Sequence, residues 1–101
     1  MQRITIKMIK YKVDAINRLM GVSVDMFKPF KINNKLQWNI GHYHITQFNG
    51  SVGLEKIVNN SGGTDNISPR LTRRELYTFC DGYLRGIQDY SYKLNGYLKA
   101  V

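Results

Sequence analysis

Cysteine and acidic residues are scarce in this chain. Its 101 residues include one cysteine, Cys80, so no intrachain disulfide can form and disulfide-stapled secreted modules are excluded. Seven Asp and Glu stand against 15 Lys and Arg, which gives a formal net charge of +8. No uninterrupted apolar run is present, so we expect no signal peptide, no membrane-spanning helix and no membrane partner.

The chain nevertheless has enough apolar residues to fold. Hydrophobic residues make up 43%, including seven Tyr, four Phe and one Trp, which is too apolar for a disordered tail. A length of 101 residues suits one domain. Such a chain buries only about 60–65% of its unfolded surface, so its core is modest and a second subunit would help it.

The positive charge is concentrated at the two ends of the chain. Residues 1–35 carry eight basic and two acidic side chains, and residues 70–101 carry six and three. Residues 36–69 carry one lysine and two acids, among many Gly, Asn and aromatic residues. This division predicts a nearly neutral scaffold flanked by basic elements that attract phosphate groups. The alternative is a charge that only keeps the protein soluble.

Residues 5–20 show a helical pattern. Apolar residues recur there at three- and four-residue spacing, at Ile9, Val13, Ile16 and Met20. Thr5 is suited to cap the start, and Gly21 stands where a left-handed residue ends a helix. A competing interpretation is a short strand with an inner face at Ile4, Ile6 and Met8, but the longer period favours the helix.

A loop is predicted over residues 21–35. Pro29 restricts the residue before it to extended geometry, and Asn33-Asn34 is typical of a turn. Three apolar side chains are expected to tuck beneath this loop, those of Met26, Phe27 and Phe30.

One β-hairpin is predicted in the middle of the chain. Alternating apolar residues indicate a strand over residues 36–47, in which Gly41 marks a phase change typical of a bulge or a close backbone approach. Asn49-Gly50 is a strong hairpin turn, and residues 52–58 then indicate the returning strand.

The last element is a helix that starts after Thr72. Thr72 and Glu75 have the spacing of a capping box, in which the two side chains satisfy free backbone N–H groups reciprocally. Leu71 and Leu76 occupy the positions of a hydrophobic staple. The apolar face continues at Leu76, Phe79, Cys80, Tyr83, Leu84 and Ile87.

Together these elements predict an α+β fold with the order helix, β-hairpin, helix. We expect a single domain over residues 1–101, with a core over residues 5–88 and a tyrosine-rich extension over residues 89–101, as a short helix or an extended arm. A two-stranded sheet is marginal in water, so both helices must cover it or a second subunit must extend it. Gly82 and Gly86, four residues apart, permit another backbone to approach, and we expect an oligomer.

Several motifs together resemble a known group of proteins. They are the strand Asn39-Ile40-Gly41-His42-Tyr43-His44, the return Gly53-Leu54, the loop from Asn59 to Gly63, and the helix that begins Arg74-Glu75-Leu76-Tyr77 and closes in Gly86-Ile87. The pattern is similar to that of small hypothetical proteins encoded by tailed bacteriophages, over roughly residues 8–87. His42 stands where that group has Asn more often, the turn at residues 47–50 is less rich in Ala and Gly, and the tail after Ile87 is extra. The resemblance implies no enzymatic activity; it implies a phage accessory role in host interaction or counter-defence.

Three arginines cluster at the start of the last helix, Arg70, Arg73 and Arg74. The first turn of a helix offers free N–H groups and the positive end of the helix dipole, both of which attract anions. Arginine also suits the planar recognition of phosphate. The alternative is a solvated face, on which Arg73 or Arg74 pairs with Glu75 or Asp65 and adds little stability.

Two histidines lie two residues apart, so His42 and His44 share a face of the predicted strand. Zinc sites need three or four protein ligands, and we expect no third ligand and no adjacent carboxylate here, hence no metal. We assign His42, His44 and Tyr43 to contacts with the base of a ligand. A structural role for the histidines and a core position for the tyrosine are the alternatives.

A glycine-containing loop follows, Asn59-Asn60-Ser61-Gly62-Gly63. Successive N–H groups in such a turn can form a nest for phosphate, and we include Asn59, Gly62 and Gly63 in the candidate site. No Gly-Lys-Ser/Thr follows, so the loop is not a Walker motif. An ordinary flexible loop is the alternative.

The candidate residues form no acid–base pair and no activated nucleophile, and Cys80 stands among apolar helix residues. We therefore expect a protein that is not an enzyme and has no cofactor.

The first hypothesis is a phage counter-defence protein in the host cytoplasm, which binds and sequesters a phosphate-bearing nucleotide or cyclic oligonucleotide near a subunit boundary. The alternative is a basic protein that binds nucleic acid through backbone phosphates, or that inhibits a host defence protein or complex. A structural phage protein acting through its tyrosine-rich tail is a third hypothesis.

Overall fold

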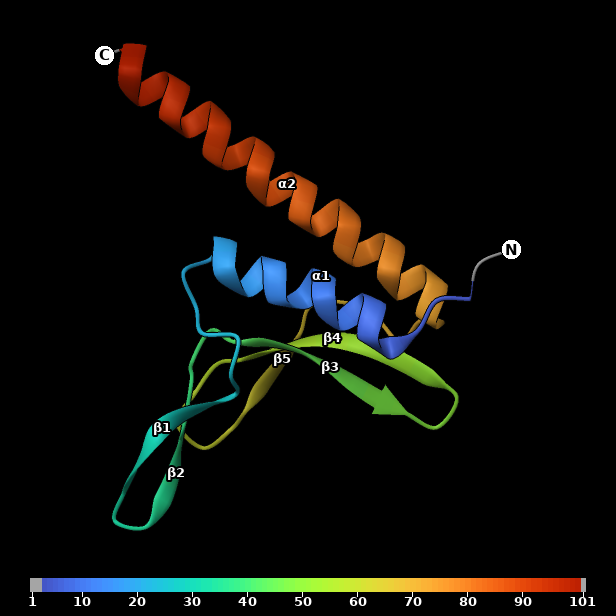
Figure 1. Cartoon of the computed structure of the whole chain (residues 1–101), viewed down its shortest axis with the longest axis vertical. Coiled ribbons are helices and arrows are strands. Elements are labelled where there is room, and N and C mark those ends of the chain that lie inside the picture. The colour runs from blue at the N-terminus through green and yellow to red at the C-terminus, as the bar shows by residue number, and fades with distance from the viewer. Residues whose placement is uncertain (1–2, 101) are drawn as a thin grey trace.

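The computed structural model describes the backbone of residues 3–100 and the side chains of residues 3–90. Its strands form two antiparallel sheets, one of two strands in the order β1-β2 and one of three strands in the order β3-β4-β5 (Figure 1). The predicted α+β class is confirmed, with one more sheet than expected. Along the chain the elements are α1 (Ile6–Leu19), β1 (Phe27–Ile32), β2 (Lys35–Trp38), β3 (Tyr43–Phe48), β4 (Ser51–Ile57), β5 (Thr64–Asn66) and α2 (Arg73–Ala100).

The α1 helix forms where the apolar spacing predicts it, which confirms the helix over the competing strand. The hydroxyl of its N-cap, Thr5, accepts a hydrogen bond from the N–H of Met8 at 3.2 Å. Gly21 follows the helix with a left-handed φ of 72°, as a C-terminal glycine should. The buried side of α1 consists of Ile9, Val13, Ile16 and Asn17.

The capping box of α2 is also confirmed. The N–H of Thr72 donates to Oε1 of Glu75 at 3.0 Å, and the N–H of Glu75 donates to Oγ1 of Thr72 at 3.2 Å. Leu76, in the first turns of the helix, is completely buried in the core. Leu71, which precedes the cap residue Thr72, packs against the same core. The helix then continues without a break to Ala100, so the tyrosine-rich segment is neither a separate short helix nor an extended arm over its described part.

The predicted loop over residues 21–35 is wrong, because much of it forms a second hairpin. β1 pairs antiparallel with β2, and Asn33 and Asn34 connect them with φ values of 54° and 61°. Both values are left-handed, as a two-residue type I′ turn requires, and asparagine tolerates them better than most side chains. The side chain of Phe30 is 53% exposed and does not tuck beneath a loop.

The predicted single strand over residues 36–47 is also wrong, because it is two strands in different sheets. Gly41 lies between β2 and β3 with a φ of 94°, and its N–H donates to the carbonyl of Ile57 at 2.7 Å. The phase change at this glycine therefore marks a change of sheet. The turn at Asn49-Gly50 is confirmed, with Gly50 at a φ of 84° between the paired strands β3 and β4.

Alternation along the strands decides which side chains of the three-stranded sheet meet the helices. One face presents core residues to α1, and α2 packs against α1 and reaches β4 (Figure 1). These core residues are Tyr43, Ile45, Val52 and Leu54. β5, which follows the loop from Asn59 to Gly63 and was not expected from the sequence, adds the third strand beside β4.

A buried asparagine joins α1 to the edge of this sheet. The Nδ2 of Asn17 donates to the carbonyl of Tyr43 at 3.0 Å, and its Oδ1 accepts the N–H of Tyr43 at 2.8 Å. The amide therefore completes the backbone hydrogen bonds of an edge residue that has no strand partner on that side. This contact fixes β3 beneath α1 and leaves the opposite face of the sheet pointing away from that helix.

Candidate functional site

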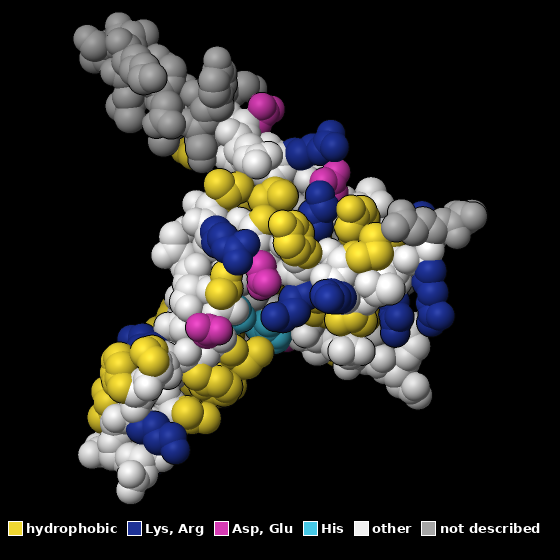
Figure 2. Space-filling view, in the orientation of Figure 1, with side chains coloured by type: hydrophobic (Ala, Val, Ile, Leu, Met, Phe, Trp, Pro, Cys, Tyr) yellow, Lys and Arg dark blue, Asp and Glu magenta, His cyan; other side chains and the backbone are white. Residues whose placement is uncertain are grey.

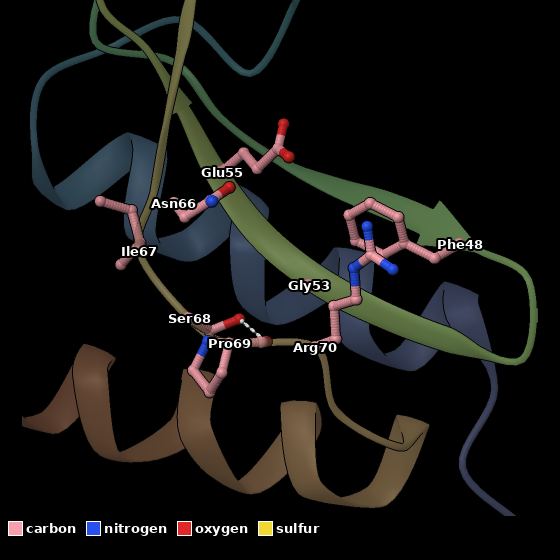
Figure 3. Close-up of a pocket in the computed structure, with 8 residues that line it drawn as sticks. All are labelled: Phe48, Gly53, Glu55, Asn66, Ile67, Ser68, Pro69 and Arg70. Atoms are coloured by element: carbon pink, nitrogen blue, oxygen red, sulfur yellow. Dashed lines mark hydrogen bonds between the residues drawn. The ribbon is translucent and has the colours of Figure 1, made fainter.

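A cavity of about 390 Å³ opens on the face of the three-stranded sheet that points away from α1 (Figure 3). We call it the sheet-face pocket. Strands β3, β4 and β5 form one side of it, and the segment between β5 and α2 forms the other. The residues that matter for its chemistry are Phe48, Gly53, Glu55, Asn66, Ser68 and Arg70.

Hydrogen bonds to β4 hold the rim segment, residues 67–71, in place. Leu71 and Val52 exchange two backbone hydrogen bonds of 2.8 Å each. The N–H of Leu54 donates to Oγ of Ser68 at 2.9 Å, and that hydroxyl donates to the carbonyl of Pro69 at 2.8 Å. Arg70 lies between these two anchors, so its backbone position is set by the sheet.

At one end of the pocket a guanidinium group lies flat on an aromatic ring. The central carbon of the Arg70 guanidinium is 4.0 Å from the centroid of Phe48 (Figure 3). Such a cation–π contact is worth about 0.5–1 kcal/mol at an exposed site and orders a side chain that is otherwise mobile. The N–H groups at the edge of the guanidinium keep the geometry needed for a bidentate contact with an anion.

At the other end, three polar side chains form a row across the sheet. The register places Glu55 opposite His44 on β3 and opposite Asn66 on β5. The Nε2 of His44 lies 3.9 Å from Oε2 of Glu55. Burial lowers the pKa of His44 and outweighs the opposite effect of the Glu55 carboxylate, so the ring is neutral at pH 7. Glu55 is the only acidic side chain of this row.

The structure brings together only part of the predicted site. Of the three arginines, Arg70 lines the sheet-face pocket, and Arg73 lines a second cavity of about 250 Å³ that also has Phe48 in its lining. Arg74 is exposed and lines neither cavity. The predicted partners His42 and His44 line a different cavity, of about 400 Å³, between α1, residues 24–26 and β3.

The assignment of Tyr43 to base contacts does not fit its position. Its side chain is 2% exposed, and its hydroxyl lies 2.9 Å from that of Tyr83 on α2. Burial and this hydrogen bond raise the pKa of Tyr43. His42 is also buried, and its Nδ1 lies 2.9 Å from the carbonyl of Ser23, which anchors the chain after α1. Both residues support the fold, because the Tyr43 hydroxyl and the Nδ1 of His42 already have protein partners.

The glycine-containing loop does not offer the predicted phosphate nest. The N–H groups of Ser61 and Gly63 donate to Oδ1 of Asn59 at 3.0 Å and 2.8 Å, and the N–H of Gly62 donates to the Asn59 carbonyl at 3.2 Å. Asn59 therefore occupies the donors that an anion would need. Gly62, with a φ of 80°, lies against the ring of Trp38. The loop supports the base of the β1–β2 hairpin.

A carboxylate does lie beside the histidines, contrary to the expectation from the sequence. Glu55 faces His44 across β3 and β4. No group of three or more His, Cys, Asp or Glu side chains with metal-binding geometry occurs among the described residues. Cys80 is buried in the core, where burial raises the pKa of its thiol to about 11, so the thiolate is a minor form at pH 7.

The site expected from the sequence does not include Phe48, Glu55 or Asn66, although Phe48 is among the aromatic residues that could stack on a base. Part of the signal was present, because a two-residue turn at Asn49-Gly50 sets the register of the hairpin. Counting back from that turn pairs His44 with Glu55 and places Phe48 on the same face, as observed. Asn66 and the rim carried no such local signal, since their position depends on β5 and on the bonds to β4.

Comparison with known proteins yields no relative. No family model matches the chain, and neither the curated proteins nor the solved structures include a match. The resemblance to phage accessory proteins therefore stays an expectation from the sequence motifs. None of the helices in the described part of the chain is both long and apolar enough to cross a membrane.

Proposed function

We propose that the sheet-face pocket binds a phosphate-bearing nucleotide and that the protein acts by sequestering it. The observation that carries this proposal is the polarity of the pocket, with a stacked guanidinium at one end and a carboxylate at the other. A nucleotide has the complementary polarity, because its phosphate is anionic while its base and ribose present N–H and O–H donors. A cavity of about 390 Å³ is within the usual size of small-molecule sites.

Arg70 is the phosphate contact in this proposal. Its guanidinium is stacked on Phe48, so binding an anion costs little additional side-chain entropy. Arg73 lines the cavity that shares Phe48 with this pocket, and it adds positive potential near the same end. This replaces the sequence-based assignment of the phosphate to Arg73 and Arg74 together.

The base or ribose contacts fall to Glu55 and Asn66. A carboxylate accepts hydrogen bonds from exocyclic amines or ribose hydroxyls, and an amide both donates and accepts. Gly53 lies between the two ends of the pocket, and a Cβ there would stand 3.5 Å from the Phe48 ring and 3.7 Å from Oγ of Ser68. The absence of a side chain at Gly53 thus leaves room for a flat ligand. The backbone conformation at this position does not itself require glycine.

We propose that this binding serves counter-defence in a host cytoplasm, in line with the resemblance to phage accessory proteins. A protein that holds a nucleotide or cyclic oligonucleotide signal in a pocket lowers its free concentration without chemical change. No catalytic step is assigned to the pocket.

We also propose that the protein is an oligomer that associates through α2. The C-terminal part of this 28-residue helix extends past the rest of the chain (Figure 1). Within the described part of the chain, no atom beyond the adjacent residues and the helix's own backbone lies within 4 Å of a Cβ added at Gly82 or Gly86, so their predicted close contact with another backbone is not made inside one copy. Tyr90 is 69% exposed farther along the helix. A second copy is the partner that this uncovered helix would accept.

The test is binding of a nucleotide panel to the full chain. Mononucleotides and cyclic dinucleotides are screened by thermal shift, and those that stabilise the protein are titrated by calorimetry. Charge-assisted hydrogen bonds are worth about 1.5–3 kcal/mol, so Arg70→Gln should weaken binding by roughly ten- to a hundredfold. Glu55→Gln keeps the side-chain size and should weaken binding by a smaller factor while changing the preference among bases.

Arg18→Gln is the matched control, because it removes the same charge from an exposed position at the end of α1. It should leave the affinity within about twofold of the parent. The proposal is wrong if no member of the panel binds, or if Arg70→Gln and Arg18→Gln bind with the same affinity.

A further inference from the structure

The β1–β2 hairpin, residues 27–38, projects from the body of the molecule as a narrow arm (Figures 1 and 2). We call it the β-arm. It is a two-stranded sheet of its own, separate from the β3-β4-β5 sheet. Two-stranded ribbons are only marginally stable alone in water, so an arm of this kind gains order when a partner covers it.

The β-arm combines exposed apolar side chains with positive charge. Phe30, Ile32 and Leu36 are 53%, 52% and 51% exposed. Three lysines, all exposed, accompany them at positions 28, 31 and 35, and residues 27–38 contain no Asp or Glu. A partner that covers this arm must therefore supply negative charge together with apolar surface.

The register distributes this chemistry over both faces of the ribbon. Lys31 pairs with Leu36 on one face, and Ile32 pairs with Lys35 on the other. Each face thus carries one lysine and one apolar side chain near the tip. A flat anionic surface would contact only one of these faces, whereas a groove with two anionic walls contacts both.

The base of the arm is braced. The rings of Phe27 and Trp38 lie 4.5 Å apart, and Trp38 rests on Gly62. The Nδ2 of Asn39 donates to the carbonyl of Asp25 at 2.8 Å, and the N–H of Asn39 donates to the carbonyl of Met26 at 2.9 Å. The arm therefore leaves the body in a defined direction.

We propose that the β-arm enters the major groove of duplex DNA. That groove is wide enough for a two-stranded ribbon, and phosphates line both of its walls. The lysines on the two faces contact the two walls, and the apolar side chains lie against thymine methyl groups. The amides of Asn33 and Asn34 stand at the tip, where base edges are exposed. Double-stranded RNA is excluded by this geometry, because its major groove is deep and narrow.

This inference concerns a surface separate from the sheet-face pocket and does not rest on the proposed nucleotide binding. The experiment measures binding of the full chain to three probes. They are a labelled mixed-sequence DNA duplex of about 20 base pairs, an RNA duplex of the same sequence, and vesicles of mixed anionic and zwitterionic lipid. Affinity for the DNA is measured by fluorescence anisotropy between 50 and 200 mM salt.

The decisive variant is K28Q/K31Q/K35Q, and its control is K7Q/K10Q/R18Q, which removes the same charge from exposed positions of α1. The arm variant should weaken DNA binding more than tenfold and reduce the salt slope by about 3, since each phosphate contact contributes about 0.9. The control should weaken binding less than threefold. Trp38, the only tryptophan in the chain, should change its emission when DNA binds the parent protein.

Three results would overturn the proposal. They are equal losses in the arm variant and the control, RNA binding as tight as DNA binding, and no binding to DNA, whether or not the protein binds vesicles. Arg70→Gln should leave DNA affinity unchanged. The proposal for nucleotide binding in the sheet-face pocket and the proposal for DNA binding by the β-arm can therefore fail independently. Circular dichroism melts establish that both triple variants are folded, as expected for exposed lysines and arginine.

Discussion

Replacement of Gly62 by alanine tests how the body of the protein supports the β-arm. A Cβ at position 62 would lie 2.6 Å from two ring atoms of Trp38, closer than real Cβ contacts allow. The backbone φ of 80° is also left-handed. Gly62→Ala therefore introduces two separate costs, one in the backbone and one in the contact with the tryptophan ring.

The size of each cost follows from the geometry. A left-handed conformation costs an L-residue about 1–2 kcal/mol. Overpacking typically costs about 1–3 kcal/mol more, at the lower end here because Trp38 is partly exposed and its ring can move. We expect Gly62→Ala to lower the free energy of unfolding by about 2–4 kcal/mol, with separation of Trp38 from Phe27.

Gly50→Ala is the matched control, because its φ is 84° and nothing lies within 4 Å of the added Cβ. It should show the backbone cost alone. Urea unfolding is followed by circular dichroism for the whole fold and by Trp38 emission for the base of the arm. The reasoning is refuted if the two variants lose equal stability and the native emission of Trp38 is the same in Gly62→Ala as in the parent.

Two further predictions concern α2 and the sheet. Gly82→Ala and Gly86→Ala should each raise the stability by about 1 kcal/mol, because both glycines are in a helix and have open space around them. If α2 is the oligomer interface, the double variant should also associate more weakly in sedimentation, and unchanged association would contradict that interface. The pKa of His44 is lowered in the folded protein. The contribution of this side chain to the free energy of unfolding is therefore present above the unfolded pKa of about 6.5 and is lost as the pH falls. Between pH 7.5 and 5.5 the parent should therefore lose more thermal stability than His44→Gln, and parallel melting curves would argue against a depressed pKa.

The charge division seen along the chain has a structural counterpart. The nearly neutral stretch, residues 36–69, supplies the whole β3-β4-β5 sheet. All three lysines of the β-arm come from the basic N-terminal third, and Arg70 and Arg73 come from the basic C-terminal third. The expectation of a neutral scaffold flanked by basic elements therefore describes the fold, although sequence alone did not show that the arm stands apart from the arginines.

The features determined by the sequence itself are those set by short-range physics. The α1 helix, the capping box that starts α2 and the Asn49-Gly50 turn depend on residues within a few positions of one another, and each is present as predicted. The hairpin at Asn33-Asn34 had the same kind of turn signal. Pro29 and this turn together are typical of a loop, but a two-stranded ribbon has two edges and tolerates proline there, so the same residues also fit a hairpin.

The composition of the site was decided only by the tertiary structure. His42 and Tyr43 look available in the sequence, but Ser23 and Tyr83, distant along the chain, bind the Nδ1 of His42 and the hydroxyl of Tyr43. Arg70 is ordered by stacking on Phe48, which lies 22 positions earlier in the chain. The hydrogen bonds between β4 and the rim segment bring the two side chains together. Such contacts depend on how sheets and helices pack, and the energy of that packing comes from surfaces far apart in the chain, so no local pattern encodes them.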